Sequence, residues 1–311
     1  MFYFMPPDDS SKTAEYMALF RALETRRSSR TRLFADPLST RFLRPPLRRI
    51  VSVASLPGGR ELIEKILDHR IPGARSSAIA RTRLIDDLLA EGMEDEAWPL
   101  VILGAGFDCR AYRLQVLKRR DVFELDQAQI LEKKRARLNA QPGTHSNVRQ
   151  IPIDFNRESL CGVLERAGLN ASLKTAFLWE GVTNYLTAEA VDSVLTYVSR
   201  FPAGSRLVFT YVHSGMLDGT VKFHGAERLL ADVAKLGEPW TFGIHPRDMD
   251  GYLERCGLRL VVDLGASEYR QRYFGDAAGE MRGYEFYHVA MAEVPRPAEN
   301  RTRIAPAGSH A

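Results

Sequence analysis

The sequence predicts an α/β fold in which helices cover both faces of a mostly parallel sheet. From about residue 92 to 211, short apolar runs alternate with helical patterns, as is typical of a parallel sheet. Two further apolar runs follow later in the chain. The expected strands are 98–103, 121–126, 147–153, 175–180, 206–212, 258–264 and 284–294. We expect the last strand to be antiparallel, at or near the sheet edge, because no obvious crossover helix precedes it.

Helices are expected where apolar residues recur at helical spacing. The clearest pattern covers 188–200, and Thr187 is its candidate N-cap. A second helix is expected over 76–92, capped by Ser76 or Ser77. A third is expected in 11–25.

These elements suggest three parts along the chain. Residues 1–91 are expected to form an N-terminal helical cap laid over the sheet. Residues 92–294 would form the core, with a helical insert at about 214–245. The polar, proline-rich residues 295–311 are expected to be a flexible tail.

The composition is that of an ordinary soluble protein. The chain has 311 residues, of which 45% are hydrophobic, with a formal net charge of +4, so it can bury a sizeable core. Its three cysteines, Cys109, Cys161 and Cys256, fit neither a disulfide framework nor a metal spacing. No apolar run approaches the roughly 18 residues of a membrane span. We therefore expect a cytoplasmic protein with no metal site and no membrane partner.

One segment is strongly basic. Residues 21–49 hold nine arginines and only two acids. Such a block either attracts an anion or an acidic partner, or forms a solvated basic face. No base-reading motif accompanies it, so we expect no nucleic-acid partner.

Two glycines leave the first expected strand in the stretch VILGAGFDCRAYRL, residues 101–114. Glycine at Gly104 and Gly106 would let a ligand approach the backbone at the carboxyl end of that strand, although a simple tight turn has the same requirement. Cys109 stands where a dinucleotide-binding pattern has its third glycine. A pyrophosphate cradle is therefore not expected.

Acidic residues end the next two strands. Asp126 lies about 20 residues after Gly106, where an acid can accept hydrogen bonds from a ribose diol or can simply cap the following helix. Glu124 shares its face and is the competing candidate, but Asp126 stands at the strand end. After the third strand, Asp154 and Phe155 are placed either to contact an adenine or to serve as a turn acid beside a core ring.

Two arginines of the expected 76–92 helix differ in their placement. Arg81 projects from the apolar, inward face, whereas Arg83 lies with Asp86 and Asp87 on the solvent side. An inward cation needs an anionic partner, which is either an acid of the protein or the carboxylate of a ligand. Together with the acids and glycines, Arg81 describes a site for a nucleoside with a short carboxylate-bearing chain and no phosphate. S-adenosylmethionine fits that description.

Several motifs resemble one family in order along the chain. They are SKTAEYMALFRALETR, FADPLSTRFL, ARTRLIDDLL, VILGAGFDCRAYRL, VFELDQ, IPIDF and LWEGVTNYLT. With these motifs the sequence resembles the leucine carboxyl methyltransferase superfamily. It is most similar to the bacterial, actinobacterial-type branch of S-adenosylmethionine-dependent O-methyltransferases, which includes enzymes that methylate polyketide acids.

The resemblance implies a Rossmann-like class I methyltransferase fold, with seven strands, one of them antiparallel, and an N-terminal helical cap. It also implies a set of cofactor contacts. Arg81 would hold the methionine carboxylate, Gly104 would lie against the cofactor, Asp126 would bind the ribose, Asp154 and Phe155 the adenine region, and Glu180 the amino-acid end. A basic residue of the N-terminal segment, Arg26 or Arg27, would also lie near the cofactor. Cys109 departs from the family, in which threonine is usual, so a hydroxyl cap would be lost.

The resulting hypothesis is methyl transfer from S-adenosylmethionine to a carboxylate of a small molecule. A carboxylate is already ionised at neutral pH and needs no general base. The alternative is methylation of a hydroxyl, assisted by Tyr185 or His213. A third interpretation is a cofactor-binding homologue without catalysis. The partner would be a small-molecule acceptor, and the protein a monomer or homodimer.

Overall fold

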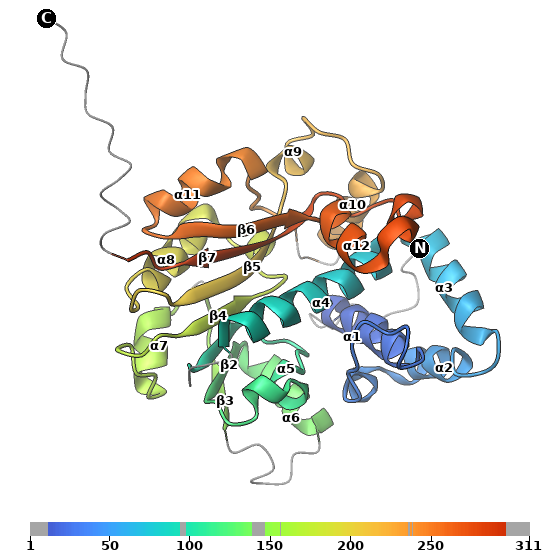
Figure 1. The fold of residues 1–311 in the computed structure, drawn as a ribbon, viewed down its shortest axis with the longest axis horizontal. Coiled ribbons are helices and arrows are strands. Elements are labelled where there is room, and N and C mark those ends of the chain that lie inside the picture. The colour runs from blue at the N-terminus through green and yellow to red at the C-terminus, as the bar shows by residue number, and fades with distance from the viewer. Residues whose placement is uncertain are drawn as a thin grey trace, which may run out of the picture.

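The computed structural model describes residues 12–93, 98–138, 147–155, 157–235, 237 and 239–296. Most of the predicted tail lies outside the described residues. At the centre is a seven-stranded sheet with the order β3-β2-β1-β4-β5-β7-β6 (Figure 1). Its strands are β1 (Leu100–Leu103), β2 (Val122–Asp126), β3 (Val148–Pro152), β4 (Ala176–Trp179), β5 (Arg206–Val212), β6 (Arg259–Gly265) and β7 (Tyr287–Glu293).

Strands β1 to β5 pair in parallel, and β7 runs antiparallel to both β5 and β6. The sequence prediction of seven strands with one antiparallel strand is thus confirmed. The antiparallel strand lies one position inside the edge, between β5 and β6.

Helices surround the sheet. They are α1 (Lys12–Thr25), α2 (Pro45–Val53), α3 (Gly59–Arg70), α4 (Ala74–Met93), α5 (Arg110–Arg113), α6 (Ala128–Leu138), α7 (Leu160–Arg166), α8 (Ala188–Val198), α9 (Ser214–Leu217), α10 (Ala226–Lys235), α11 (Met249–Arg255) and α12 (Ala266–Phe274). Short 3-10 turns cover Ser39–Phe42, Gln115–Leu117, Thr183–Tyr185, Pro246–Asp248 and Gly275–Glu280. The insert predicted at about 214–245 contains α9 and α10.

Alternate residues of the central strands enter two hydrophobic cores, one on each face of the sheet. In β1, Val101 and Leu103 face a core with α7, α8 and α11, whereas Leu100 and Ile102 face a core with α4, α5 and α12. This division follows from the two-residue period of a strand. Both faces of the sheet are therefore covered by helices, as the apolar strands predict.

Two helix predictions need correction, and one is confirmed. Thr187 caps α8 by accepting a hydrogen bond from Ala190 N at 3.3 Å, as expected. Helix α4 begins at Ala74, so Ser76 and Ser77 lie inside its first turn and do not cap it. Their hydroxyls are used elsewhere: Ser76 Oγ donates to Gly73 O, and Ser77 Oγ lies 2.6 Å from the Tyr269 hydroxyl.

The second correction concerns α12, which precedes β7 where no helix was expected. Its buried side chains include Tyr269 and Arg270 in addition to Ala266, so it has no simple apolar stripe. A helix that buries an arginine gives little periodic signal in the sequence.

Helices α1 to α3 form the N-terminal cap, drawn in blue in Figure 1. Leu19 and Leu23 of α1 join a core with α2 that also includes Phe107 and Cys109 from the loop after β1. The Phe42 and Phe107 rings stack with centroids 4.7 Å apart. The cap therefore packs directly on the loop that carries the two glycines. The division of the chain at residue 91 stays a prediction.

Several arginines of the basic block at 21–49 bind acids or backbone carbonyls of the fold. Arg21 pairs with Asp36 at 2.9 Å, and Arg44 pairs with Glu15 at 2.6 Å. Arg41 and Arg48 donate to backbone carbonyls. These four arginines stabilise the cap and its contact with the core, whereas Arg26, Arg30, Arg32 and Arg49 are exposed. The block is therefore partly structural and partly a solvated basic face.

A buried arginine ties α4 to the segment before β7. Arg270 is 1% exposed and donates to the carbonyls of Met281 and Gly73 at 3.0 and 2.8 Å, and also to that of Gly283. A Cβ on Gly73 would come within 2.2 Å of Gly283 O, so the two backbone segments touch. This contact fixes α4 relative to β7, both of which contribute to the site described below.

We predict that Arg270→Met lowers the free energy of unfolding by about 3 kcal/mol, because three buried carbonyls lose their donor. Urea unfolding of the variant measures this loss. Arg272→Met, an exposed arginine of the same helix, serves as the control and should change stability by under about 0.5 kcal/mol. Similar losses for both variants would contradict the assigned role of Arg270.

Candidate functional site

The carboxyl ends of β1, β2, β3 and β4 lie side by side and bring the predicted site residues together. Ala105 N, just past β1, donates to Leu125 O of β2 at 2.9 Å. Ile153 N, just past β3, donates to Asp126 O at 3.0 Å. In open α/β sheets this edge is where ligands bind.

The loop after β1 needs both of its glycines. Gly104 has φ +69°, and a Cβ on it would lie 2.4 Å from Val182 Cγ2 in the segment after β4. Gly106 has φ +42°, a backbone conformation that side chains rarely adopt, although a Cβ on it would make only ordinary contacts, with Ala14 Cβ at 3.9 Å and Gly104 O at 4.0 Å. The chain therefore makes a tight bend at this edge, and at Gly104 it leaves no room for a side chain.

Asp126 at the end of β2 holds this loop in place. Its Oδ2 accepts a hydrogen bond from Gly106 N at 2.6 Å, and its Oδ1 accepts one from Gln127 N at 2.7 Å. Burial raises the pKa of Asp126, and the two backbone hydrogen bonds oppose that rise. Each carboxylate oxygen still has a lone pair with which to accept from a diol.

Glu124, the competing candidate for the ribose, binds partners in the interior of the protein. It is fully buried and lies 2.9 Å from Lys134 Nζ, which is also fully buried. It also accepts hydrogen bonds from Tyr112 OH at 3.3 Å and Gln150 Nε2 at 3.0 Å. These contacts favour Asp126 for the ribose, and that assignment stays a prediction.

Asp154 and Phe155 follow β3 at the same edge, and both are half-buried. Asp154 Oδ2 lies 3.5 Å from Arg157 Nε, and Phe155 packs against the hydrophobic core that contains α7. Both interpretations of this pair remain open, because its placement suits an adenine contact as well as a turn acid beside a core ring.

Arg81 and Glu180, predicted for the two charged groups of the methionine, are in contact. Arg81 is 6% exposed, and its Nε donates to Glu180 Oε1 at 2.9 Å. The Arg81 guanidinium also lies 4.5 Å from the centroid of the Tyr287 ring. Its inward orientation agrees with the sequence prediction, and in this structure its anionic partner is an acid of the protein.

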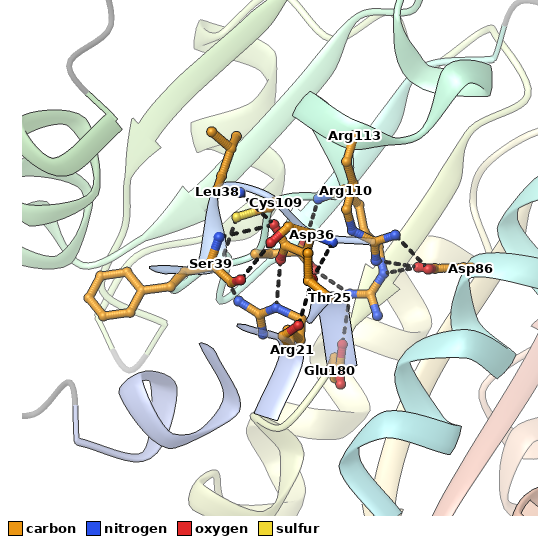
Figure 2. A network of polar contacts seen from close by, with 12 residues as sticks. Arg21, Thr25, Asp36, Leu38, Ser39, Asp86, Cys109, Arg110, Arg113 and Glu180 are labelled. Carbon is orange, nitrogen blue, oxygen red and sulfur yellow. Dashed lines mark hydrogen bonds and ion pairs between the residues drawn. The ribbon is translucent and has the colours of Figure 1, made fainter. Parts of the chain in front are cut away.

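A second arginine, which the sequence analysis missed, holds the other oxygen of Glu180 (Figure 2). Arg110 Nη1 donates to Glu180 Oε2 at 2.7 Å and also contacts Asp108, while Arg110 Nε donates to Asp86 at 2.8 Å. Arg113 binds Asp86 through two nitrogens at 2.7 and 2.8 Å. Arg110 and Arg113 are three residues apart in the motif RAYR, a helical spacing that signals a shared acidic partner.

Asp86 was expected on the solvent side and is instead buried, with 6% exposure. It lies on the flank of α4 that faces α5, where the two arginines neutralise it. Arg83 does lie on the outer side, with its Nε 2.9 Å from Asp87. The prediction was therefore correct for Arg83 and Asp87 and wrong for Asp86.

The arginines of this network keep Glu180 and Asp108 ionised. Burial alone would raise the pKa of Glu180, but Arg110 and Arg81 outweigh it and lower the pKa. The same balance of burial against Arg110 lowers the pKa of Asp108 to about 2. An ionised Glu180 retains further lone pairs that can accept from an ammonium group.

The basic residue that reaches this edge from the cap is Arg21, not Arg26 or Arg27. Arg26 is exposed, and Arg27 lies 3.8 Å from Glu24 and 3.6 Å from Glu64. Both follow the end of α1, whereas Arg21 lies within the helix. Its Nη2 donates to Phe107 O in the glycine loop at 2.6 Å while Asp36 holds its Nε (Figure 2).

Cys109 makes no cap to α5, as expected from its replacement of threonine. Its thiol is buried, and burial raises its pKa well above the ordinary value. Asp108 takes over the capping, because its Oδ1 accepts from Arg110 N at 2.6 Å. The departure from the family pattern is thus compensated by the preceding residue.

His213 and Tyr185 lie on the side of the site formed by β5 and the insert. His213 Nδ1 accepts from Gly215 N at 3.0 Å, which assigns the proton of the neutral ring to Nε2. Burial lowers the pKa of His213, and His245 and His288 add to this effect. The Tyr185 ring packs edge-on against Trp240, with centroids 6.2 Å apart.

The described residues contain no group of three or more His, Cys, Asp or Glu side chains that could hold a metal ion. None of their helices combines the length and the apolar character needed to cross a membrane.

The residues of this edge suit S-adenosylmethionine. Asp126 offers acceptors for a diol, Glu180 for an ammonium, and Gly104 presents bare backbone. In the described part of the chain, Glu180 is the one carboxylate paired with Arg81, and the pair is formed through the Nε atom of the arginine. Arg81 Nη2 lies 3.4 Å from Met17 Sδ, which is an uncharged and weak hydrogen-bond acceptor. The guanidinium can therefore still receive a carboxylate.

We predict that Arg81→Met weakens S-adenosylmethionine binding by about 10- to 100-fold, because the cofactor carboxylate loses a charged donor. Isothermal titration calorimetry measures the change. Arg83→Met, two residues along the same helix, should leave the affinity within about twofold. Equal losses for the two variants would contradict the placement of Arg81 at the cofactor.

We also predict opposite phenotypes for the two acids of β2. Asp126→Ala should weaken cofactor binding by about 1.5–3 kcal/mol with a smaller effect on stability. Glu124→Gln should lower the free energy of unfolding by about 3 kcal/mol, because it leaves Lys134 buried without its counter-charge, and should hardly change the affinity. Calorimetry and urea unfolding distinguish them, and unchanged affinity in Asp126→Ala would remove the ribose assignment.

Comparison with known proteins identifies the family of this chain. Residues 14–199 match the family model for leucine carboxyl methyltransferase. A relative from Mycolicibacterium smegmatis, named "Putative S-adenosyl-L-methionine-dependent methyltransferase", is 32% identical over 275 residues, which cover 84% of this chain and 87% of the relative. A relative of the same description from Frankia alni is 31% identical over 251 residues, covering 79% and 81% of the two chains.

Solved structures share the fold. The crystal structure of a "putative methyltransferase" from Thermobifida fusca has a TM-score of 0.56 at 17% identity and covers 90% of this chain and 94% of its own. A DUF574 family protein from Streptomyces avermitilis has a TM-score of 0.53 at 14% identity, with 90% and 97% covered. Together with the seven-stranded sheet, these matches show the Rossmann-like class I methyltransferase fold. By its match over residues 14–199 and by the relative that is 32% identical over 84% of the chain, the chain belongs to the leucine carboxyl methyltransferase family.

Proposed function

We propose that this S-adenosylmethionine-dependent methyltransferase esterifies a carboxylate of a small molecule. Methyl transfer as such follows from membership of the family. The carboxylate acceptor is supported by the name of the family and by the placement of His213. The resemblance to enzymes that methylate polyketide acids supports a secondary metabolite as the acceptor.

The residues of the site would hold the cofactor by its polar groups. When bound, S-adenosylmethionine supplies an electrophilic methyl group on a positively charged sulfur, which an acceptor oxygen takes up. Arg81 would bind the cofactor carboxylate, Glu180 its ammonium and Asp126 its ribose, while Gly104 lets the backbone lie against it. Since these groups are fixed by partners in the fold, their main contribution is to position the cofactor and exclude water from the reacting atoms.

The observation that carries the carboxylate proposal is the hydrogen bond from Gly215 N to His213 Nδ1. It occupies the lone pair that a neutral histidine needs to accept a proton from a substrate. A carboxylate acceptor is ionised at neutral pH and makes no such demand. The acceptor can therefore react without a base.

One observation favours the alternative, methylation of a hydroxyl. The lowered pKa of His213 keeps its ring neutral, which is the form that a general base requires. To act, the ring would have to give up its bond to Gly215 N, or Tyr185 would have to assist instead. A cofactor-binding protein without catalysis is the remaining rival of the carboxylate proposal. The proposals of a cytoplasmic location, a monomer or homodimer and no nucleic-acid partner are independent of this choice.

The two acceptor chemistries predict different products. A methyl ester made with labelled S-adenosylmethionine should release volatile methanol in mild alkali, and its formation should vary little with pH above about 6, where the acid is ionised. A methyl ether would survive alkali, and its formation would rise with pH toward the pKa of a phenol or of an assisting base. Alkali-stable label with a rising pH profile would contradict the carboxylate proposal, and absence of any transfer would favour the non-catalytic rival.

A further inference from the structure

A buried amide beside the site has no hydrogen-bond partner in the part of the chain that the structure describes. Asn184 is 1% exposed, and neither its Oδ1 nor its Nδ2 has a hydrogen-bond partner among the described residues. Burying an amide without hydrogen bonds is unfavourable, and native proteins rarely leave both of its polar atoms unpaired. Such a group is expected where a bound molecule supplies the missing partner.

The position of Asn184 is fixed by the backbone around it. It lies four residues after Glu180, and its carbonyl accepts a hydrogen bond from Thr241 N at 2.8 Å. The preceding Thr183 donates through Oγ1 to Thr210 O of β5 at 2.7 Å. Asn184 therefore lies between the carboxyl ends of β4 and β5 on one side and the last part of the insert on the other.

A second unpaired donor belongs to that part of the insert. Trp240 Nε1 is buried and has no partner in the described chain. Its indole ring lies 6.2 Å from the ring of Tyr185 and 6.2 Å from that of Tyr287. The guanidinium of Arg81 lies 4.5 Å from the centroid of the Tyr287 ring. These aromatic rings therefore lie next to the residues expected to bind the cofactor.

The surroundings of these two groups are apolar. Trp240 and Phe286 have ring centroids 6.1 Å apart, and Phe286 also contacts Phe223 and Tyr284. We define the acceptor cluster as Tyr185, Phe223, Trp240, Tyr284, Phe286 and Tyr287. A ligand on this cluster would have an apolar body, and the two unpaired groups together offer hydrogen-bond donors for an oxygen.

We propose that Asn184 and Trp240 bind the carboxylate of an apolar acid, the methyl acceptor, whose body lies against the acceptor cluster. One carboxylate oxygen accepts hydrogen bonds from Asn184 Nδ2 and Trp240 Nε1, which leaves the other oxygen to receive the methyl group. The inference rests on the proposed function and extends it, because it assigns acceptor recognition to two residues outside the cofactor contacts.

The first test uses stability without any ligand. Asn184→Leu replaces an unpaired amide by an apolar side chain of similar size, so we expect Tm to rise by about 2–4 °C. Asn147→Leu is the matched control, because Asn147 Nδ2 donates to two carbonyls at 3.0 and 2.8 Å. That variant should have a lower Tm than the wild type. A fall in Tm for Asn184→Leu would show that the amide is satisfied within the fold and would overturn the inference.

The second test measures recognition with a panel of phenylacetic, naphthylacetic and decanoic acids and labelled S-adenosylmethionine. Asn184→Leu and Trp240→Phe, which removes only the indole donor and keeps a ring, should each raise KM for every acid that the wild type esterifies by about tenfold or more. Their affinity for S-adenosylmethionine should stay within about twofold of the wild type. Asn147→Leu should leave KM unchanged.

The outcomes separate this inference from the proposed function. Ester formation with KM unchanged in both variants would overturn the inference alone. A loss of S-adenosylmethionine affinity in the variants would assign the two residues to the cofactor and would also overturn it. If the wild type esterifies none of the acids and instead gives alkali-stable label on phenols, both the inference and the carboxylate proposal are wrong.

Discussion

The site depends on the carboxylate of Glu180, which two buried arginines hold from opposite sides. Arg81 comes from α4 and Arg110 from α5, so the carboxylate at the end of β4 joins three elements that are far apart in the sequence. A buried ion is unfavourable unless it is paired and hydrogen-bonded. Here three arginines and three carboxylates balance one another, and Glu180 is the member of this set that follows the sheet edge where a ligand binds. Removing any one of them would leave a buried charge, so the network fixes the geometry of the site as well as its charge.

The N-terminal cap completes this geometry from the other side of the glycine loop. The ring of Phe42 stacks on Phe107, and Arg21 donates to the Phe107 carbonyl. Asp126 holds the same loop through Gly106 N. The loop is therefore fixed by the cap and by β2 together. The cap can pack in this way because the guanidinium groups of Arg21 and Arg44 pair with acids of the cap, while Arg21 and Arg41 also donate to backbone carbonyls of the core.

The sheet could be predicted from the sequence because its strands are short apolar runs. The position of the candidate site, at the carboxyl ends of the strands, could be predicted because glycines and acids follow those runs. The burial of Asp86 could not be predicted. A helical pattern identifies the apolar face of α4, but it does not show that another helix, α5, covers the side that carries Asp86. Helix α12 was missed for a similar reason, because it buries Arg270 and Tyr269 where a regular helix would bury aliphatic residues. In both cases a charged side chain is buried by partners from distant parts of the chain.

Glu124 and Asp126 show what separates a structural acid from a site acid in this fold. They lie on the same face of β2, two residues apart, and local pattern barely distinguishes them. Lys134 forms an ion pair with Oε1 of Glu124 in the interior, and Tyr112 and Gln150 donate to its Oε2, so its energetic role is to hold α6 and β3 against β2. Asp126 receives one backbone donor on each oxygen and keeps acceptor capacity at the edge. Asn184 is the clearest example, because its buried side-chain amide has no hydrogen-bond partner among the described residues. Polar groups that are paired within the fold stabilise it. Polar groups at the end of a strand that keep free hydrogen-bonding capacity are the ones available to a ligand.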